Sequence, residues 1–328
     1  MKYRVIGQNP DTRRKVSVLS LGAMLFGTAT DEATSFAILD RYVEAGGTFI
    51  DTSNNYAFWV NGSQGGESEQ LLGRWRRSRG IGDEITLATK LGARPLAAGT
   101  SYVDNPEGLS IKAIREAAER SREQLGMDTL HLLYAHIEDS TVPLQETVEG
   151  FAELVAEGTV GLLGVSNHWM WKVERARNIA RAADLPGYEV LQYQHSYLRK
   201  RADLPGQLSQ DGDQGVVAGD MLSALREDPE LTLVAYSPLL GGAYVRADKP
   251  LGPVFEHAGT PVQQAVLREV AEEAGATVNQ VVLAWLIGAE IPAIPLVGAS
   301  SVAQLNDSLA AVDLELTVEQ RARLDAAR

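Results

Sequence analysis

Asp51-Thr52-Ser53-Asn54-Asn55-Tyr56 follows an apolar, strand-like run at residues 47–50 and places a carboxylate five positions before a phenol. Two further β-prone runs also stop on an ionisable side chain, because residues 87–89 precede Lys90 and residues 132–135 precede His136. An acid, a phenol, an amine and an imidazole therefore all follow predicted strands. Such a set is typical of a proton-transfer site built at strand ends.

The rest of the chain alternates between strand and helix patterns. β-prone runs lie at residues 19–23, 48–51, 85–89, 129–134, 161–165, 190–193, 231–236 and 293–297, and helical periodicity lies at residues 32–45, 110–125, 144–157, 169–183, 216–226, 261–274 and 302–312. Residues 3–6 and 15–19 indicate a small hairpin before them. This alternation predicts the α/β class with a parallel sheet. We expect a (β/α)8 TIM barrel with a short N-terminal hairpin, formed by residues 1–328 as a single domain.

An open, doubly wound sheet is the rival fold. It usually carries a glycine-rich turn after its first strand, where a dinucleotide binds. Here residues 21–27 read Leu-Gly-Ala-Met-Leu-Phe-Gly, which lacks the required glycine spacing. The barrel also explains why Asp51, Lys90, His136, Ser166 and Gln192 all fall at strand ends.

Composition excludes several classes of function. A net charge of −13 argues against nucleic-acid and anionic-membrane partners, since phosphate binding needs a basic stripe. The basic run Arg74, Arg76, Arg77 and Arg79 suits the last turn of a helix that ends near Gly80. The chain has no cysteine, and its five histidines show no paired ligand spacing, so we predict no metal site.

No secretion signal or membrane span is predicted. The N-terminus lacks an apolar signal core, which favours a cytoplasmic location. The most apolar late stretch, residues 281–299, is interrupted by Glu290, Pro292 and Pro295, so it indicates a helix followed by a strand.

Taken singly, the ionisable residues at the strand ends are ordinary. Tyr56 could be a packing residue, Lys90 a surface charge and Asp51 a turn residue. If adjacent strands bring them together, Lys90 can pair with Asp51 and lower the pKa of Tyr56 by favouring the phenolate. Tyr56 would then exchange a proton with a carbonyl or alcohol oxygen, and His136 would orient and polarise that oxygen.

These residues belong to a longer series of motifs. The series reads Tyr3-Arg4, Gly22-Ala23-Met24, Asp51-Thr52-Ser53 with Tyr56, Gly66-Glu67-Ser68-Glu69 with Leu72-Gly73, Thr89-Lys90, His136, Gly164-Val165-Ser166-Asn167, Gln192, Tyr236-Ser237-Pro238-Leu239, and Ile294-Pro295 with Gly298. In order and spacing the chain resembles the aldo-keto reductase superfamily, nearly from end to end. The resemblance implies a (β/α)8 barrel, a nicotinamide cofactor and reversible carbonyl reduction. It implies that Tyr56 is the general acid, that Lys90 and Asp51 set its pKa, and that His136 binds the carbonyl oxygen.

The resemblance also implies a cofactor site. Ser166, Asn167 and Gln192 correspond to the residues that bond the nicotinamide carboxamide, although ordinary strand-end hydrogen bonding is the alternative. The remaining cofactor positions that the resemblance implies are Gly22, Ala23, Met24 and Asp51 near the nicotinamide, Tyr236, Ser237, Pro238, Leu239 and Gly241 at the pyrophosphate, and Gly298, Ser300, Gln304, Asp307 and Ser308 around the adenosine. A helix N-terminus there would suit an anion, and Ser300 or Ser301 would also cap that helix.

Three positions depart from the family pattern. His195 stands where an aromatic residue usually stacks on the nicotinamide, and Tyr197 is the alternative partner. Ser300 stands where many relatives carry Arg or Lys for the 2′-phosphate of NADP, and Lys249 is a candidate substitute. Ser308 replaces the usual Asn near the adenine. NADP(H) is expected from the family, with NAD(H) as the alternative.

The expected substrate is a small aldehyde or ketone. The candidate residues around it are Met24, Tyr56, Phe58, Trp59, His136 and Trp169. Trp169 and Trp171 flank Met170 at a helix start, so at most one of them faces the pocket. Two other functions stay open: a barrel aldolase with a Schiff base on Lys90, and a cofactor-binding regulatory subunit with negligible turnover. The sequence does not indicate an oligomeric state.

Overall fold

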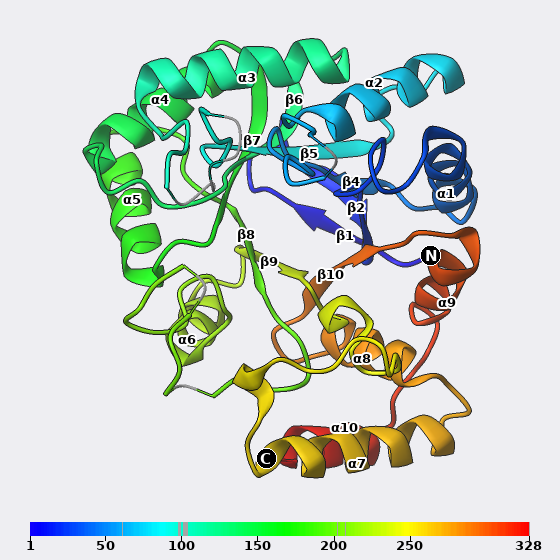
Figure 1. The fold of residues 1–328 in the computed structure, drawn as a ribbon. Helices are drawn as coiled ribbons and strands as arrows, with labels where there is room; N and C mark the ends of the chain where they lie inside the picture. Colours follow the sequence, from blue (N-terminus) through cyan, green and yellow to red (C-terminus); the bar gives the residue numbers. More distant parts are fainter. Residues whose placement is uncertain (61, 98–99, 101–103, 202, 207, 328) are drawn as a thin grey trace.

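The computed structural model describes residues 1–60, 62–97, 100, 104–201, 203–206 and 208–327, and its centre is a closed parallel β-barrel (Figure 1). The barrel strands are β3 (Ser20–Gly22), β4 (Phe49–Asp51), β5 (Thr86–Leu91), β6 (Leu130–Ala135), β7 (Val160–Ser166), β8 (Val190–Gln194), β9 (Thr232–Tyr236) and β10 (Ala293–Gly298). Each strand pairs with the next along the chain, and β10 closes the circle on β3. The predicted α/β class and (β/α)8 barrel are confirmed.

Helices surround the barrel (Figure 1). They are α1 (Glu32–Glu44), α2 (Glu67–Arg79), α3 (Ile111–Leu125), α4 (Leu144–Ala156), α5 (Met170–Ala182), α6 (Gly219–Glu227), α7 (Gly259–Glu273), α8 (Val278–Ile287), α9 (Val302–Ala310) and α10 (Val318–Ala326). Two short 3-10 helices, η1 (Leu240–Gly242) and η2 (Pro253–Phe255), lie in the connection after β9. Apolar side chains between strands and helices form the larger core, because both faces of a parallel sheet must be covered.

The predicted N-terminal hairpin is also confirmed. Its strands, β1 (Tyr3–Ile6) and β2 (Arg14–Ser17), pair in antiparallel register. Ile6 and Val16 are buried against inward-facing barrel residues that include Phe49 and Leu162. Burial of these side chains closes one end of the barrel interior, so a ligand must enter elsewhere.

Helix boundaries follow local signals in most places. The basic run after Arg74 does end α2, whose last turn leads to Gly80 in the left-handed conformation. Helix α6 starts at Gly219 instead of residue 216, since Val216 pairs with Gln194 in an isolated bridge. Helix α10 was not predicted, although Thr317 and Gln320 form a capping box at its start.

Residues 281–299 form most of α8 and then β10, as the prolines and Glu290 predict. Among the residues that the structure describes, no helix has both the length and the apolar character needed to cross a bilayer.

Candidate active site

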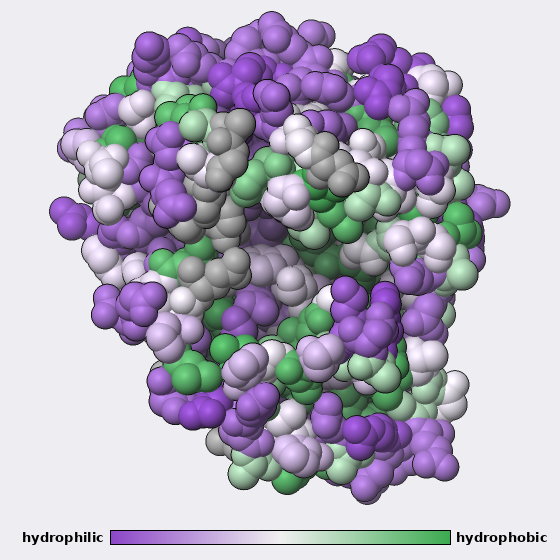
Figure 2. All heavy atoms as spheres, viewed as in Figure 1, coloured by the Kyte–Doolittle hydropathy of each residue, from purple (hydrophilic) through white to green (hydrophobic). Residues whose placement is uncertain are grey.

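Parallel pairing brings the predicted site residues to one end of the barrel. Asp51 lies opposite Ala88 on β5, and Lys90 lies two residues beyond, opposite Tyr134 on β6. Ser166 on β7 is paired with Gln192 on β8. Figure 2, drawn from the same side as Figure 1, shows a hollow near the centre of the molecule, over the barrel. The carboxyl ends of parallel strands meet at one rim, which is where catalytic residues of such barrels come from.

Lys90 is the centre of the site. Its side chain is 0% exposed, and its ammonium donates to the Asp51 carboxylate. It also donates to the Thr52 carbonyl oxygen and the Tyr56 hydroxyl oxygen, each at 2.8 Å. A lysine ammonium has three protons, so these three contacts use all of them and fix the nitrogen in place.

The pKa of Tyr56 departs from the sequence-based prediction. It is raised well above its usual value, first by burial and then by the Asp51 carboxylate, whose Oδ1 lies 3.4 Å from the hydroxyl. The prediction that Lys90 lowers this pKa considered the cation alone. Burial disfavours the phenolate, and Asp51 opposes the effect of Lys90. Tyr56 is therefore a neutral phenol, the form that donates a proton.

His136 follows β6 and lies beside Tyr56, with the two rings edge to face at 6.0 Å. Its Nδ1 is 3.0 Å from the Ser53 hydroxyl oxygen. Burial, with a further contribution from the positive charge of Lys90, lowers the pKa of His136 well below its usual value. The imidazole is accordingly neutral at physiological pH.

The three residues predicted to hold a carboxamide are hydrogen-bonded to protein groups in this structure. Gln192 Nε2 donates to Asp51 Oδ2 at 2.7 Å, and the Ser166 hydroxyl donates to the Gln192 carbonyl oxygen. Asn167 Nδ2 donates to the His136 carbonyl oxygen, while its Oδ1 accepts from Tyr236. These bonds join β6, β7, β8 and β9 at the rim, so the strand-end alternative accounts for the contacts seen here.

A second buried network lies on the outer side of β5. Thr89 points away from Lys90, as strand neighbours do, and its hydroxyl donates to Glu69 Oε1 at 2.5 Å. Ser68, the preceding residue of α2, donates to the Ala23 carbonyl oxygen and accepts from the Thr52 hydroxyl at 2.7 Å. The first turn of α2 thus supports both Lys90 and the Thr52 carbonyl that Lys90 contacts.

We expect replacement of Glu69 by glutamine to reduce the pH dependence of stability. Burial raises the pKa of Glu69 from 4.5 to about 7, so the folded state keeps a proton that the unfolded chain releases. Stability from this group is fully present below the unfolded pKa and is lost as pH rises through about 7. Between pH 5.5 and 8 the loss is roughly 2 kcal/mol. Urea unfolding at both pH values should show a loss smaller by that amount in E69Q.

The matched control for that experiment is Glu116→Gln, because the Glu116 side chain is 58% exposed on α3. It should leave the pH dependence unchanged. If the stability of E69Q and that of the wild-type protein fell equally with rising pH, Glu69 would already be ionised across this pH range.

The predicted phosphate-side residues divide into two groups. One group is exposed: Ser237 and Gly241 follow β9, Gly298 ends the neighbouring strand β10, and Ser300 and Gln304 follow it. Backbone at Gly241 and Gly298 is open, since a Cβ at either position would meet nothing within 4 Å. The backbone N–H and the hydroxyl of Ser300 both donate to Gln304 Oε1, at 2.9 Å and 3.0 Å, so a ligand that uses them must replace these bonds.

The other group faces the protein. Asp307 Oδ1 accepts from Gln280 Nε2 at 2.8 Å and from the Thr277 hydroxyl at 3.2 Å, so it holds the start of α8. Ser308 is buried, as is Pro238, whose carbonyl oxygen accepts from Ser196. Ala23 and Gly22 lie at the end of β3, where Gly22 is paired with both Gly298 and Asp51.

The two candidates for stacking on a nicotinamide have different surroundings. Tyr197 is 3% exposed, and its hydroxyl donates to the Leu324 carbonyl oxygen in α10, in the outer helix layer. His195 is half-buried beyond β8, and its ring lies 5.7 Å from that of Trp285. Burial lowers the pKa of His195 to about 4. Because its ring is neutral and lies at the rim, His195 is a better candidate than Tyr197 for stacking on a nicotinamide.

Apolar side chains lie in the segments that follow the strands. Met24 is 41% exposed and Trp59 is 52% exposed, and Phe58 contacts Trp59 edge to face at 5.0 Å. Trp169 is half-buried, whereas Trp171 is 57% exposed, which agrees with the prediction that the two rings face different ways. The exposed Trp59 ring, packed on the half-buried Phe58 in the segment that follows Tyr56, is a candidate substrate surface.

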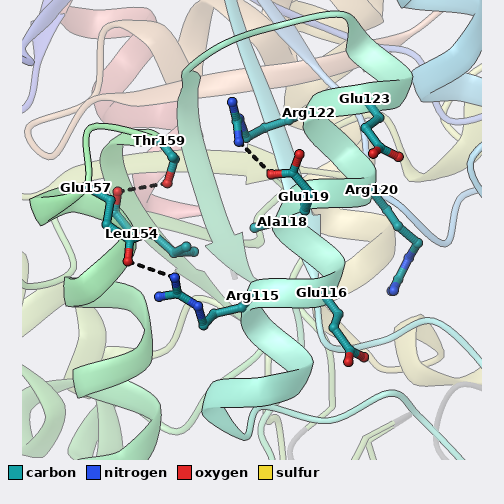
Figure 3. Close-up of a pocket in the computed structure, with 10 residues that line it drawn as sticks. All are labelled: Arg115, Glu116, Ala118, Glu119, Arg120, Arg122, Glu123, Leu154, Glu157 and Thr159. Atoms are coloured by element: carbon teal, nitrogen blue, oxygen red, sulfur yellow. Dashed lines mark hydrogen bonds and ion pairs between the residues drawn. The ribbon is translucent and has the colours of Figure 1, made fainter.

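A surface depression lies elsewhere, between α3, α4 and the start of β7 (Figure 3). Arg115 pairs with Glu153 and Glu157, and Arg122 pairs with Glu119. Paired charges of this kind are typical of solvated helix faces. We assign the functional site to the strand ends because the buried, polarised groups are there.

Sequence reasoning gave no role to Thr52, Ser53, Ser68 or Glu69. All four are fully buried, and each is hydrogen-bonded within the networks just described. Their polar side chains next to apolar strand residues were the available signal, since buried hydroxyl and carboxyl groups need partners. The partners themselves follow only from the three-dimensional packing.

Comparison with known proteins gives consistent results. Residues 18–328 match the model of the aldo/keto reductase family. An oxidoreductase of Bacillus subtilis (strain 168), YrpG, whose name calls it uncharacterized, is 30% identical over 97% of this chain and 93% of its own length. Norsolorinic acid reductase stcV of Emericella nidulans is 31% identical over 93% of this chain and 76% of its own length. Aryl-alcohol dehydrogenase (NADP+) of Phanerodontia chrysosporium is 30% identical over 93% of this chain and 80% of its own length.

Proposed function

Because the chain belongs to the aldo/keto reductase family, we propose that it reduces an aldehyde or ketone to an alcohol with a reduced nicotinamide cofactor. The observation that carries this proposal is the convergence of Asp51, Tyr56 and the Thr52 carbonyl on the buried ammonium of Lys90. A neutral phenol held beside a cation is suited to give a proton to an oxygen on which negative charge develops.

The residues at the rim fit such a cofactor. Gln192, Ser166 and Asn167 supply the amide and hydroxyl groups that bond a carboxamide, provided that their present internal bonds rearrange. Open backbone at Gly241 and Gly298, with the exposed Ser237 nearby in sequence, suits phosphate oxygens. The start of α9, beside Ser300, adds helix N–H groups.

Each part of the reaction has an assigned group. When bound, the cofactor supplies a hydride to the carbonyl carbon and is oxidised. Tyr56 gives its proton to the carbonyl oxygen, which completes the alcohol, and solvent later restores the phenol. Lys90 donates to the Tyr56 oxygen throughout, so it stabilises the phenolate that forms. Asp51 keeps Lys90 protonated against the effect of burial, which lowers the pKa of the amine.

An aromatic carbonyl compound is the substrate that we propose. Trp59 offers exposed ring surface in the segment that follows Tyr56, and the half-buried Phe58 contacts it edge to face. Ring stacking of this kind contributes about 1 kcal/mol beyond the burial of apolar area. The names of two relatives, a norsolorinic acid reductase and an aryl-alcohol dehydrogenase, are consistent with this class.

For the cofactor we propose NADP(H), the form that one relative is named for. Separate fluorescence titrations with NADPH and NADH test this, because tryptophans such as Trp285 and Trp59 lie near the rim. NADPH should bind more tightly. Ser300→Arg should increase that preference by roughly 10- to 100-fold, since a charge-assisted bond to phosphate adds about 1.5–3 kcal/mol.

Ser63→Arg is the control for added positive charge. Ser63 lies in the loop between β4 and α2, and the predicted phosphate-side residues lie instead at the ends of β9 and β10 and beyond them. It should leave the NADPH to NADH ratio unchanged. Tighter binding of NADH by the wild-type protein would contradict the proposed preference, and failure to bind either cofactor would contradict the proposed function.

The two other functions considered from the sequence fit the site less well. A Schiff-base aldolase needs an accessible amine, whereas the Lys90 nitrogen is enclosed and uses all three donors. A regulatory subunit does not need Asp51, Tyr56 and Lys90 in contact. The cytoplasmic location and the single-domain organisation of residues 1–328 stay predictions.

A further inference from the structure

Lys200 is a half-buried cation in the connection between β8 and α6. Its Nζ donates to the side-chain oxygen Oε1 of Gln194 at 2.6 Å. Within the part of the chain that the structure describes, Lys200 forms no ion pair with a carboxylate. Its one side-chain partner there is a neutral amide, so the positive charge of the ammonium is not neutralised at close range.

The partner of Lys200 faces the mouth of the barrel. Side chains alternate along a strand, so Val190, Gln192 and Gln194 share the inner face of β8. Val190 belongs to the core inside the barrel, and Gln192 reaches Asp51 across it. Gln194 lies two residues beyond Gln192, which is about 7 Å further towards the rim. The ammonium of Lys200 therefore lies above the layer of side chains that contains the proton-transfer site.

The backbone on both sides of Lys200 is fixed. The Leu198 N–H donates to the Tyr244 hydroxyl oxygen at 2.9 Å. The Arg201 N–H donates to the Val254 carbonyl oxygen at 2.8 Å. Both acceptors belong to the connection after β9, so the segments that follow β8 and β9 meet here. An anchored backbone limits the positions open to the ammonium, which lowers the entropic cost of binding a ligand.

The same connection returns towards the candidate substrate residues. A Cβ placed on Gly212 would lie 3.7 Å from the Trp169 ring, so this segment packs on the start of α5. Burial lowers the pKa of Lys200, and the carboxylate of Asp213 acts in the opposite direction. Asp213 therefore lies near Lys200 without pairing with it. The lysine thus borders the side of the rim that carries Trp169, whereas the exposed phosphate-side residues follow β9 and β10.

We propose that Lys200 binds an anionic group of the substrate, and that the preferred substrates are aromatic aldehydes or ketones that carry a carboxylate. This proposal rests on the proposed carbonyl reduction and names a class of its substrate. The carbonyl group lies at Tyr56, and the carboxylate, at the other end of the molecule, accepts from the Lys200 ammonium. A charge-assisted bond is stronger than a bond to a neutral amide, so the carboxylate displaces Gln194.

The test compares 4-carboxybenzaldehyde with 4-formylbenzamide, which has a neutral amide of nearly the same size in place of the carboxylate. The value of kcat/KM is measured for each compound with the wild-type protein and with Lys200→Met. We expect K200M to lower the ratio of the carboxylate value to the amide value by roughly tenfold, because one charge-assisted bond at a partly exposed site is lost. Each ratio compares two substrates in one protein, so a general loss of activity cancels.

Two further variants separate a binding site from a general effect of charge. Lys200→Arg keeps a cation at this position and should keep most of the preference for the carboxylate. Arg201→Met removes the adjacent cation, which is paired with Asp203, and should keep the wild-type ratio. An equal fall of the ratio in R201M and K200M would overturn the proposal, since any nearby positive charge would then have the same effect.

A phosphate of the cofactor is the other anion that this lysine could contact. Fluorescence titrations of K200M with NADPH and NADH distinguish the two sources. Both dissociation constants should stay at their wild-type values if the anion belongs to the substrate. Weaker binding of both cofactors together with an unchanged substrate ratio would assign the lysine to the cofactor and overturn the proposal.

Failure of this proposal is distinguishable from failure of the proposed function. An unchanged ratio in a K200M protein that reduces both aldehydes would overturn the anion site and leave carbonyl reduction intact. If neither aldehyde is reduced, their binding, followed by tryptophan fluorescence, still decides the question. 4-Carboxybenzaldehyde should bind the wild-type protein roughly tenfold more tightly than K200M, and 4-formylbenzamide should bind both equally. Equal binding of 4-carboxybenzaldehyde by the two proteins would overturn it.

Discussion

Tyr56→Phe should lower kcat/KM for aldehyde reduction by roughly a thousandfold, because it removes the one proton that the site directs at the carbonyl oxygen. The ring remains, so its contacts with Lys90 and His136 persist. Cofactor binding, followed by tryptophan fluorescence, should change little. Loss of turnover with retained binding separates proton donation from assembly of the site.

Tyr188→Phe provides the matched control. Tyr188 is also buried, but it packs on Phe151 in the outer core, and its hydroxyl has no partner among the described residues. Activity should be unchanged in that variant. A Y56F protein that keeps wild-type turnover would show that the proton comes from another group.

Lys90→Met should lower activity by a similar factor and also destabilise the fold. It removes the partner of a carboxylate that is 1% exposed, and it leaves Asp51 with Gln192 as its remaining side-chain donor within 3 Å. Loss of one partner from a buried ion pair costs roughly 3–5 kcal/mol. Urea unfolding at pH 7 measures this cost directly.

Two variants make that result interpretable. Lys112→Met removes an exposed lysine on α3, 84% exposed, and should change stability by less than about 0.5 kcal/mol. The double variant Asp51→Asn with Lys90→Met should recover much of the lost stability, since no buried charge remains. No recovery would show that the methionine itself does not fit the space.

Most of the fold could be predicted from the sequence. Strands and helices differ in the period of their apolar residues, and the two patterns alternate regularly along this chain. The ends of β4, β5 and β6 were located through Asp51, Lys90 and His136, and their meeting follows from parallel pairing. Helix α10 was missed, although Thr317 and Gln320 carry a capping signal. Its short amphipathic pattern lies after the last strand, where the alternation no longer helps.

The pKa shifts in the site could not be predicted from the sequence. The pKa of Tyr56 depends on how completely the phenol is buried and on its distance to Asp51, which only the folded structure fixes. The contacts of Asp307 with α8 depend on packing between residues far apart in sequence.

The most direct test of the account is to mix the protein with an aromatic aldehyde and NADPH, follow loss of NADPH absorbance, and identify the product. We expect one alcohol formed for each NADPH oxidised, with no adduct on Lys90 after borohydride treatment. Tight NADPH binding without turnover of any aldehyde in a broad panel would contradict carbonyl reduction and favour a regulatory role. Aldehyde trapped on Lys90 by borohydride would favour the aldolase.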